Sequence, residues 1–245
     1  MYADSEIRIF PSPSEMAEKF AGELALMISS AGQSSVFNVA LAGGSTPGLL
    51  YSVIGDHFSS SVPWERVGFY WGDERCVLPD DPQSNYGLAS RTLLMKIGPV
   101  HSSVHRIMGE NKPEAEAERY SELLKANLPN KHGLPNFDLV LLGLGEDGHT
   151  ASIFPDQIKL MHSSKLCDVA HHPASGQKRI TLTGPVLNNA AMVVFLVTGS
   201  KKAAIVRKIL ENAHGSENFP AAGIVPSHGK MIWLLDREAS SELKM

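Results

Sequence analysis

Asp147 and His149 are the residues whose types and spacing most directly suggest proton-transfer chemistry. They stand in the segment 137–155, FDLVLLGLGEDGHTASIFP, where an apolar run ends in several glycines. A histidine exchanges protons near neutral pH, and glycines let the backbone adopt a positive φ and approach a ligand closely. In open α/β sheets, ligands bind beyond the carboxyl ends of such buried strands. The segment therefore predicts that Asp147 and His149 stand at the ligand-binding edge of the sheet, where His149 could transfer a proton.

The glycines of this loop also allow a different interpretation. Gly143, Gly145 and Gly148 spell GxGxxG, the pattern of dinucleotide-binding loops, which requires a long following helix and an acidic residue about 20 residues further on. Pro155 falls inside the expected helix, where proline costs ~3 kcal/mol. Asp168 has about the right separation, but its surroundings are too short and polar for a convincing core strand. We therefore expect no dinucleotide cofactor.

A second loop has the character of an anion site. The apolar segment 36–41 is followed by two glycines, a serine and a threonine, and then by Pro47 and an apolar helical pattern. Serine or threonine is favoured at a helix cap and proline at the first helical position. The free amides and the dipole of a helix N-terminus favour an anion such as phosphate, although a simple capped turn is the alternative. The candidate phosphate ligands are Gly43, Gly44, Ser45 and Thr46.

A third loop carries charges directly after the apolar segment 67–71. It contains Asp73 and Arg75, and parallel strands would bring it to the same edge as His149. The polar, proline-bearing segment 79–86 that follows is a candidate lid.

Two further cations could hold an anionic ligand. Arg179 opens the apolar segment RITLT, and Lys202 follows the strongly apolar segment 192–197. A cation at a helix N-terminus is locally unfavourable, and a bound anion would reverse that penalty.

Apolar segments alternate with helical patterns along the whole chain. This alternation predicts an α/β fold, a three-layer Rossmann-like and mainly parallel sheet with helices on both faces, in one domain spanning residues 1–245. The expected strands are 7–10, 36–41, 67–71, 138–142, 180–183, 192–197 and 231–235, and the expected helices are 14–29, the segment after Pro47, 86–97, 114–128 and the segment from 201.

Composition excludes several classes of protein. The net charge of −4 disfavours nucleic acid as a partner, and no apolar run approaches the ~20 residues that span a membrane. Two cysteines without paired spacing and no visible secretory signal predict a cytoplasmic protein. The adjacent histidines His171 and His172 lack HxxxH or HExxH spacing, so we expect no metal.

Five motifs in order, AGGSTP, YWGDER, GLGEDGHTASIFP, RITLT and TGSKKA, resemble those of the 6-phosphogluconolactonases. The wider group includes the glucosamine-6-phosphate deaminases, which typically carry an Asn-Glu pair shortly after the histidine, whereas residues 152–155 here read SIFP. The resemblance implies a cofactor-free hydrolase that opens 6-phospho-D-glucono-1,5-lactone in the oxidative pentose phosphate pathway. It also selects Lys202 over Lys201, through the family's GxxK pattern.

The resemblance and the residue types together suggest roles. His149 would activate water, Arg75 would stabilise the former carbonyl oxygen, and either Asp73 or Asp147 would orient the imidazole or bind sugar hydroxyls. The glycine loop, Arg179 and Lys202 would hold the phosphate. A deaminase or isomerase acting on a phosphosugar, and a non-catalytic phosphosugar-binding regulator, remain alternatives. The oligomeric state is left open between a monomer and a small homo-oligomer.

Overall fold

The centre of the molecule is a six-stranded sheet in which every neighbouring pair is parallel. The computed structural model describes residues 5–32, 35–98 and 103–244. In spatial order the strands are β1 (Ser5–Phe10), β11 (Lys230–Asp236), β10 (Met192–Val197), β7 (Leu139–Leu142), β2 (Phe37–Leu41) and β3 (Val67–Trp71). All four residues of β7 are buried, because apolar side chains cover both faces of an internal parallel strand. The predicted α/β class with a mainly parallel sheet is confirmed.

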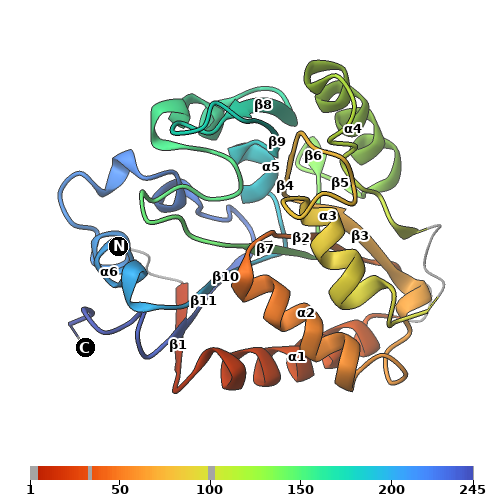
Figure 1. Cartoon of the computed structure of the whole chain (residues 1–245), viewed down its shortest axis with the longest axis horizontal. Coiled ribbons are helices and arrows are strands. Elements are labelled where there is room, and N and C mark those ends of the chain that lie inside the picture. The colour runs from red at the N-terminus through yellow and green to blue at the C-terminus, as the bar shows by residue number, and fades with distance from the viewer. Residues whose placement is uncertain (1–4, 33–34, 99–102, 245) are drawn as a thin grey trace.

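Helices and a smaller sheet cover the central sheet. The helices are α1 (Pro13–Ser30), α2 (Ser45–His57), α3 (Asn85–Ala89), α4 (Pro113–Asn127), α5 (Gly184–Asn188) and α6 (Ala203–Leu210), and a π-helical turn, Ser90–Leu94, continues α3. Figure 1 shows α1 and α2 below the sheet, and α4, α5 and the smaller sheet above it. No helix among the described residues is both long and apolar enough to cross a bilayer.

The smaller sheet differs from what the sequence predicted. It is antiparallel, in the order β4-β9-β8, and is built from β4 (Asp73–Arg75), β9 (Lys178–Leu182) and β8 (Cys167–His171). We expected a loop at β4, a strand of the main sheet at β9 and no convincing core strand at β8. The polar segment at β8 is indeed a strand, because β9 supplies its backbone partners, but it lies outside the central sheet. A two-stranded ribbon, β5 (Asn130–Lys131) and β6 (Leu134–Pro135), completes the strands of the described residues.

Gly72 joins the two sheets. It is the single residue between β3 and β4, its amide donates to the Leu41 carbonyl of β2 at 2.9 Å, and its carbonyl accepts from the Leu182 amide of β9 at 2.8 Å. The small sheet is therefore fastened directly to the carboxyl edge of the large one. This junction places the side chains of β4 and β9 over the ends of β2 and β3.

The segment after the GxGxxG pattern is not a dinucleotide-binding unit. The glycines are followed by a tight turn and then by a 3-10 helix, Pro155–His162, with a non-helical residue at Gln157. A dinucleotide site requires a long α-helix here, so that its N-terminus can face the pyrophosphate.

Candidate active site

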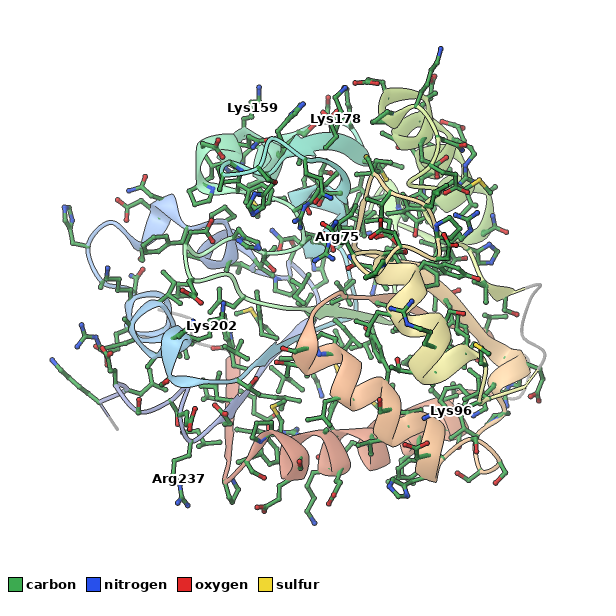
Figure 2. The ribbon with its side chains drawn as sticks, in the orientation of Figure 1. Arg75, Lys96, Lys159, Lys178, Lys202 and Arg237 are labelled. Carbon is green, nitrogen blue, oxygen red and sulfur yellow. The ribbon has the colours of Figure 1, made fainter. Side chains whose placement is uncertain are left out.

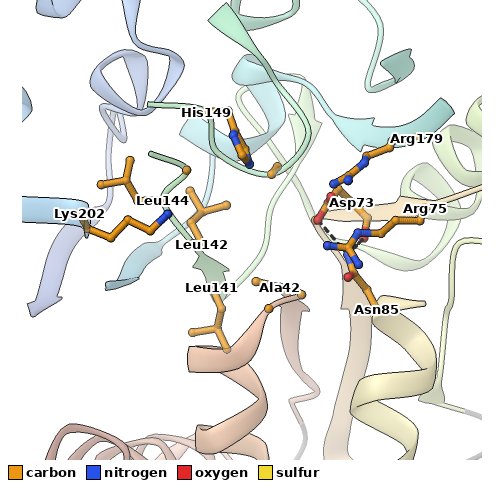
Figure 3. Close-up of a pocket in the computed structure, with 16 residues that line it drawn as sticks. Ala42, Asp73, Arg75, Asn85, Leu141, Leu142, Leu144, His149, Arg179 and Lys202 are labelled. Atoms are coloured by element: carbon orange, nitrogen blue, oxygen red, sulfur yellow. Dashed lines mark hydrogen bonds between the residues drawn. The ribbon is translucent and has the colours of Figure 1, made fainter. Parts of the chain in front are cut away.

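A cavity of about 200 Å³ lies at the carboxyl edge of the central sheet. Its walls come from the loops after β2, β3, β7 and β10, and from the small sheet (Figure 3). The residues that line it are Ala42, Gly43, Gly44, Gly72, Asp73, Arg75, Asn85, Leu141, Leu142, Gly143, Leu144, Gly145, His149, Ala151, Arg179 and Lys202. The topology thus gathers residues from positions 42 to 202 at one edge.

His149 is held by Asp147. The imidazole Nδ1 lies 2.6 Å from Asp147 Oδ1, and the same oxygen accepts from the His149 backbone amide at 3.1 Å. Burial alone would raise the pKa of Asp147, but the hydrogen bond and charge of His149 outweigh it and lower this pKa to about 2. An ionised carboxylate only accepts hydrogen bonds, so Nδ1 carries the proton and Nε2 of the neutral ring keeps a free lone pair. His149 can therefore take a proton at Nε2.

The backbone around His149 is shaped by two glycines and one strained residue. A Cβ on Gly145 would lie 2.1 Å from His149 Nδ1, so only glycine lets the ring pack against this strand end. Gly148 has a φ of 83°, and a Cβ there would lie within 2.8 Å of Phe219. Ala151 lines the cavity with a φ of 48°, in the left-handed region that non-glycine residues seldom occupy. These positions fix the direction of the imidazole.

Asp73 belongs to a different network and does not orient the imidazole. It is buried, its Oδ2 accepts from Ser152 Oγ at 2.6 Å, and its Oδ1 accepts from Asn85 Nδ2 at 3.1 Å. The sequence left open whether Asp73 or Asp147 bonds to His149, and the structure gives this contact to Asp147. Asp73 remains among the residues that line the cavity.

Glu74 holds the start of α3 in place, a role that the sequence did not indicate. Its buried carboxylate accepts from the backbone amides of Arg75, Asn85 and Tyr86, each at 2.7 or 2.8 Å, and from Ser84 Oγ at 3.0 Å. Burial raises the pKa of Glu74, and the backbone hydrogen bonds oppose this. The carboxylate caps the first turn of α3, so it fixes the helix against the small sheet.

The candidate lid, residues 79–86, is hydrogen-bonded to the small sheet. Its Gln83 carbonyl accepts a hydrogen bond from Arg75, and its Ser84 side chain caps α3 by accepting from the Gly87 amide at 2.9 Å.

Arg75 and Arg179 stand side by side. They are direct cross-strand partners in the antiparallel pair β4–β9, and Figure 3 shows both guanidinium groups beside Asp73. The Nε atoms of both are buried and have no hydrogen-bond partner among the described residues. The pKa of Arg179 is lowered, first by burial and then by the charge of Arg75. Two like charges held together in this way favour an anionic or strongly polarised ligand.

Lys202 approaches the cavity from the opposite wall. Figure 2 shows Lys202 and Arg75 on opposite sides of the central region, and Lys201 is exposed. Burial lowers the pKa of Lys202, while the charges of Glu146 and Asp147 oppose this. A bound anion near its ammonium group would offset the cost of burial.

The N-terminus of α2 differs from the prediction. Gly44, with a φ of 108°, is the cap residue, and no side chain caps the helix. Ser45 and Thr46 are the first helical residues, so Pro47 occupies the third helical position instead of the first. Glycine is needed at the cap because its φ is positive. The amides of the first turn have no partners within the helix and are available to an anion.

Thr46 connects this helix to the loop that carries Lys202. Its hydroxyl lies 2.7 Å from the hydroxyl of Thr198, the residue after β10. The following Gly199 amide donates to both oxygens of the buried Asp236, at 3.0 and 3.1 Å. These contacts fix Lys202 relative to the start of α2.

Most of the predicted site residues share the cavity. Gly43, Gly44, Asp73, Arg75, His149, Arg179 and Lys202 line it, whereas Asp147, Ser45 and Thr46 are not among its lining residues. Asn85 is the principal polar residue that the sequence reasoning missed, since a lone asparagine in a polar segment gives no distinctive signal. Within the described ranges, no three His, Cys, Asp or Glu side chains are grouped as a metal would require.

The geometry defines a class of protein: an α/β enzyme with one imidazole base and several cations at the carboxyl edge of a parallel sheet. Residues 11–233 match the family described as glucosamine-6-phosphate isomerases/6-phosphogluconolactonase. The chain belongs to this family.

Named relatives cover most of the chain. It is 42% identical over 197 residues to a 6-phosphogluconolactonase of Treponema pallidum, which covers 80% of this chain and 82% of the relative. It is 37% identical over 231 residues to one of Haemophilus influenzae, covering 94% and 96% of the two chains. The solved 6-phosphogluconolactonase of Trypanosoma brucei superposes with a TM-score of 0.87 at 31% identity, covering 98% of this chain and 99% of that one.

Proposed function

We propose that this chain is a 6-phosphogluconolactonase, a hydrolase that opens 6-phospho-D-glucono-1,5-lactone to 6-phosphogluconate in the oxidative pentose phosphate pathway. The observation that carries the proposal is the oriented His149, whose Nδ1 contacts Asp147 and whose Nε2 has no hydrogen-bond partner among the described residues, beside a cavity with three cations. The relatives named above, which are similar along most of the chain, support the choice of substrate.

The chemistry begins with a water molecule beside His149. Nε2 takes a proton from this water as its oxygen attacks C1 of the lactone, and the carbonyl electrons move onto the carbonyl oxygen. Arg75 stabilises that negative charge. When the tetrahedral intermediate collapses, the bond between C1 and the ring oxygen breaks, and the imidazolium returns the proton to the ring oxygen. His149 ends each cycle neutral.

The phosphate is held at the other side of the cavity. The amides at the start of α2 and the ammonium group of Lys202 supply hydrogen bonds and positive charge, and the bond between Thr46 and Thr198 keeps these two elements together. Arg179, the cross-strand neighbour of Arg75, is also proposed to hold the phosphate. We propose that this hydrolysis requires neither a metal nor a cofactor.

A deaminase is less well supported by the surroundings of His149. The six residues after the histidine contain no acid, and the buried Phe154 ring lies 4.8 Å from the imidazole centroid. The Asn-Glu pair that deaminases typically carry shortly after this histidine, whose Glu serves their ring-opening and isomerisation chemistry, is therefore absent from residues 150–155. Turnover of glucosamine 6-phosphate would reveal that activity.

The proposal is tested with freshly generated lactone, since this substrate also opens in water without an enzyme. We expect rapid hydrolysis above that background and a kcat/KM for unphosphorylated gluconolactone that is lower by about 10²-fold, because charge-assisted hydrogen bonds to the phosphate are lost. Equal kcat/KM values for the two lactones would refute a phosphate pocket, and no hydrolysis above background would refute the enzyme.

Three finer points are proposed on the sequence alone. We expect a cytoplasmic protein, either a monomer or a small homo-oligomer, that does not bind nucleic acid. The net charge of −4 and the two unpaired cysteines support this view.

A further inference from the structure

Ser152 joins the turn that carries His149 to the small sheet. The residue is fully buried, its Oγ donates to Asp73 Oδ2 at 2.6 Å, and its amide donates to Thr181 Oγ1 at 3.2 Å. The Thr181 hydroxyl donates in turn to the Leu182 carbonyl at 3.0 Å. A hydroxyl this close to a carboxylate makes one of the stronger hydrogen bonds found in proteins. One residue thus links the turn to both β4 and β9.

The two partners of Ser152 lie on the face of the small sheet that displays the arginines. Asp73 and Thr181 are direct cross-strand partners in the pair β4–β9. Arg75 and Arg179 are partners too, two residues away along each strand. Side chains alternate between the two faces of a sheet, so residues two apart share a face. Ser152 is therefore bonded to the same face from which both arginines project.

Hydrogen bonds within the turn brace it around the imidazole. The Gly145 amide donates to the His149 carbonyl at 2.9 Å. The Ile153 amide donates to the Thr150 carbonyl at the same distance. Ser152 lies inside this bonded segment, three residues after His149. A shift of its anchor on the small sheet would therefore shift the imidazole as well.

The anchor itself is held from its other side. The Asp73 backbone carbonyl and Oδ1 accept from Asn85 Nδ2, at 2.9 and 3.1 Å. The Asn85 amide donates to the buried Glu74 carboxylate at 2.7 Å. The Asp73 carboxylate is thus fixed within the small sheet, and the bond from Ser152 transmits that position to the turn.

We propose that Ser152 is a positioning residue that sets the His149 base against Arg75. This inference rests on the proposed function. The base and the group that stabilises the oxyanion act on the same carbon of the lactone, but they belong to different sheets, as Figure 3 shows. Their relative position must be fixed by contacts between the turn and the small sheet, because small displacements of reacting groups are costly.

The first test is Ser152→Ala, which removes the hydroxyl and keeps the backbone bond to Thr181. We expect kcat to fall by about tenfold or more, since base and oxyanion donor lose their alignment. KM and the Kd for 6-phosphogluconate should change by less than about threefold, because the buried hydroxyl contacts the protein and not the ligand. The measurements are steady-state kinetics with freshly generated lactone and direct binding of the product.

The second test repeats this substitution in the Arg75→Ala background. With no oxyanion donor left to align, the loss of kcat caused by Ser152→Ala should be smaller than in the wild type by about threefold or more. A loss that came only from a loosened fold would be the same factor in both backgrounds.

Two further variants complete the comparison. Ser152→Cys fills nearly the same space with a weaker donor, so its kcat should lie between those of the wild type and Ser152→Ala, and it serves if the alanine variant does not fold. Ser52→Ala is the matched control, because this half-buried hydroxyl donates to the Gly48 carbonyl of its own helix at 3.1 Å. It should keep the wild-type kcat.

An unchanged kcat in the folded Ser152 variants, or an equal fall in both Arg75 backgrounds, would overturn the role of Ser152 while leaving the lactonase intact. A wild type that does not hydrolyse the lactone above background would overturn the inference together with the proposed function.

Discussion

The two walls of the cavity, the turn after β7 and the small sheet, differ in how their charged groups are paired. On the turn after β7, the charge of Asp147 is matched to the His149 imidazole at 2.6 Å. On the small sheet, Arg75 and Arg179 are neighbours, and their buried Nε atoms have no partner in the described part of the chain. The difference is what the roles proposed for the two walls would require. A proton acceptor must have one direction and one tautomer, whereas a charge that stabilises a ligand must not be neutralised beforehand.

Removing the base should have the largest effect. We expect His149→Ala to lower kcat by ~10² to 10⁴, because general acid–base catalysis typically contributes that much, while phosphosugar binding is largely kept. The measurement is steady-state kinetics together with direct binding of 6-phosphogluconate. Near-normal turnover in a folded variant would remove His149 from the mechanism.

The arginine wall is tested next. Arg75→Ala should lower kcat by ~10² to 10³, as for the loss of an oxyanion donor, because the charge it meets develops only during attack on the carbonyl. KM should change less than kcat. A variant with raised KM and unchanged kcat would place Arg75 at the phosphate instead.

Lys202→Ala should show the reverse pattern. If the ammonium group contacts the phosphate equally in the ground and transition states, KM should rise by about 10-fold to 100-fold and kcat should be spared. Lys201→Ala serves as the matched control, because that neighbouring lysine is exposed. A fall in kcat for Lys202→Ala, with a raised KM for Arg75→Ala, would mean that the substrate lies the other way round.

The smallest effect concerns the stability that Asp147 contributes. Its pKa is lowered from 3.8 to about 2 in the folded protein, so the ionised carboxylate favours the folded state above about pH 4. This contribution should decline as the pH falls from 4 towards 2. The difference in the free energy of unfolding between the wild type and Asp147→Asn should therefore shrink over that range. An unchanged difference would show that the carboxylate charge has no part in holding the imidazole.

Most of the central sheet could be predicted because buried parallel strands are continuous apolar runs. β7 and β10 were expected within one residue of their observed ends. The glycine turn could be predicted for the same reason, since it interrupts such a run. Once the strands are parallel, their carboxyl ends must meet, which brings loops after Leu41 and Leu142 together.

The small sheet could not be predicted, because its strands lack a local signal. β4 has three charged residues without apolar alternation, and its partners in β9 are more than a hundred positions away. The cap of α2 was misplaced since Ser, Thr and Gly are all acceptable caps, and only the positive φ at Gly44 decides between them. Asn85 could not be singled out because its hydrogen bonds to Asp73 and Glu74, 12 and 11 positions earlier, depend on how α3 packs against β4.

The strand order determines when neighbouring strands can pair during translation. β7 lies between β2 and β10, and the Asn38 amide donates to Asp138 Oδ2 at 2.8 Å across 100 positions. The apolar strand β2 therefore cannot pair with β7 until translation has passed residue 142. Contacts of such long range are slow to form and leave apolar strands exposed to aggregation. The cavity itself is complete only after Lys202, the last of its lining residues in the sequence, has been added.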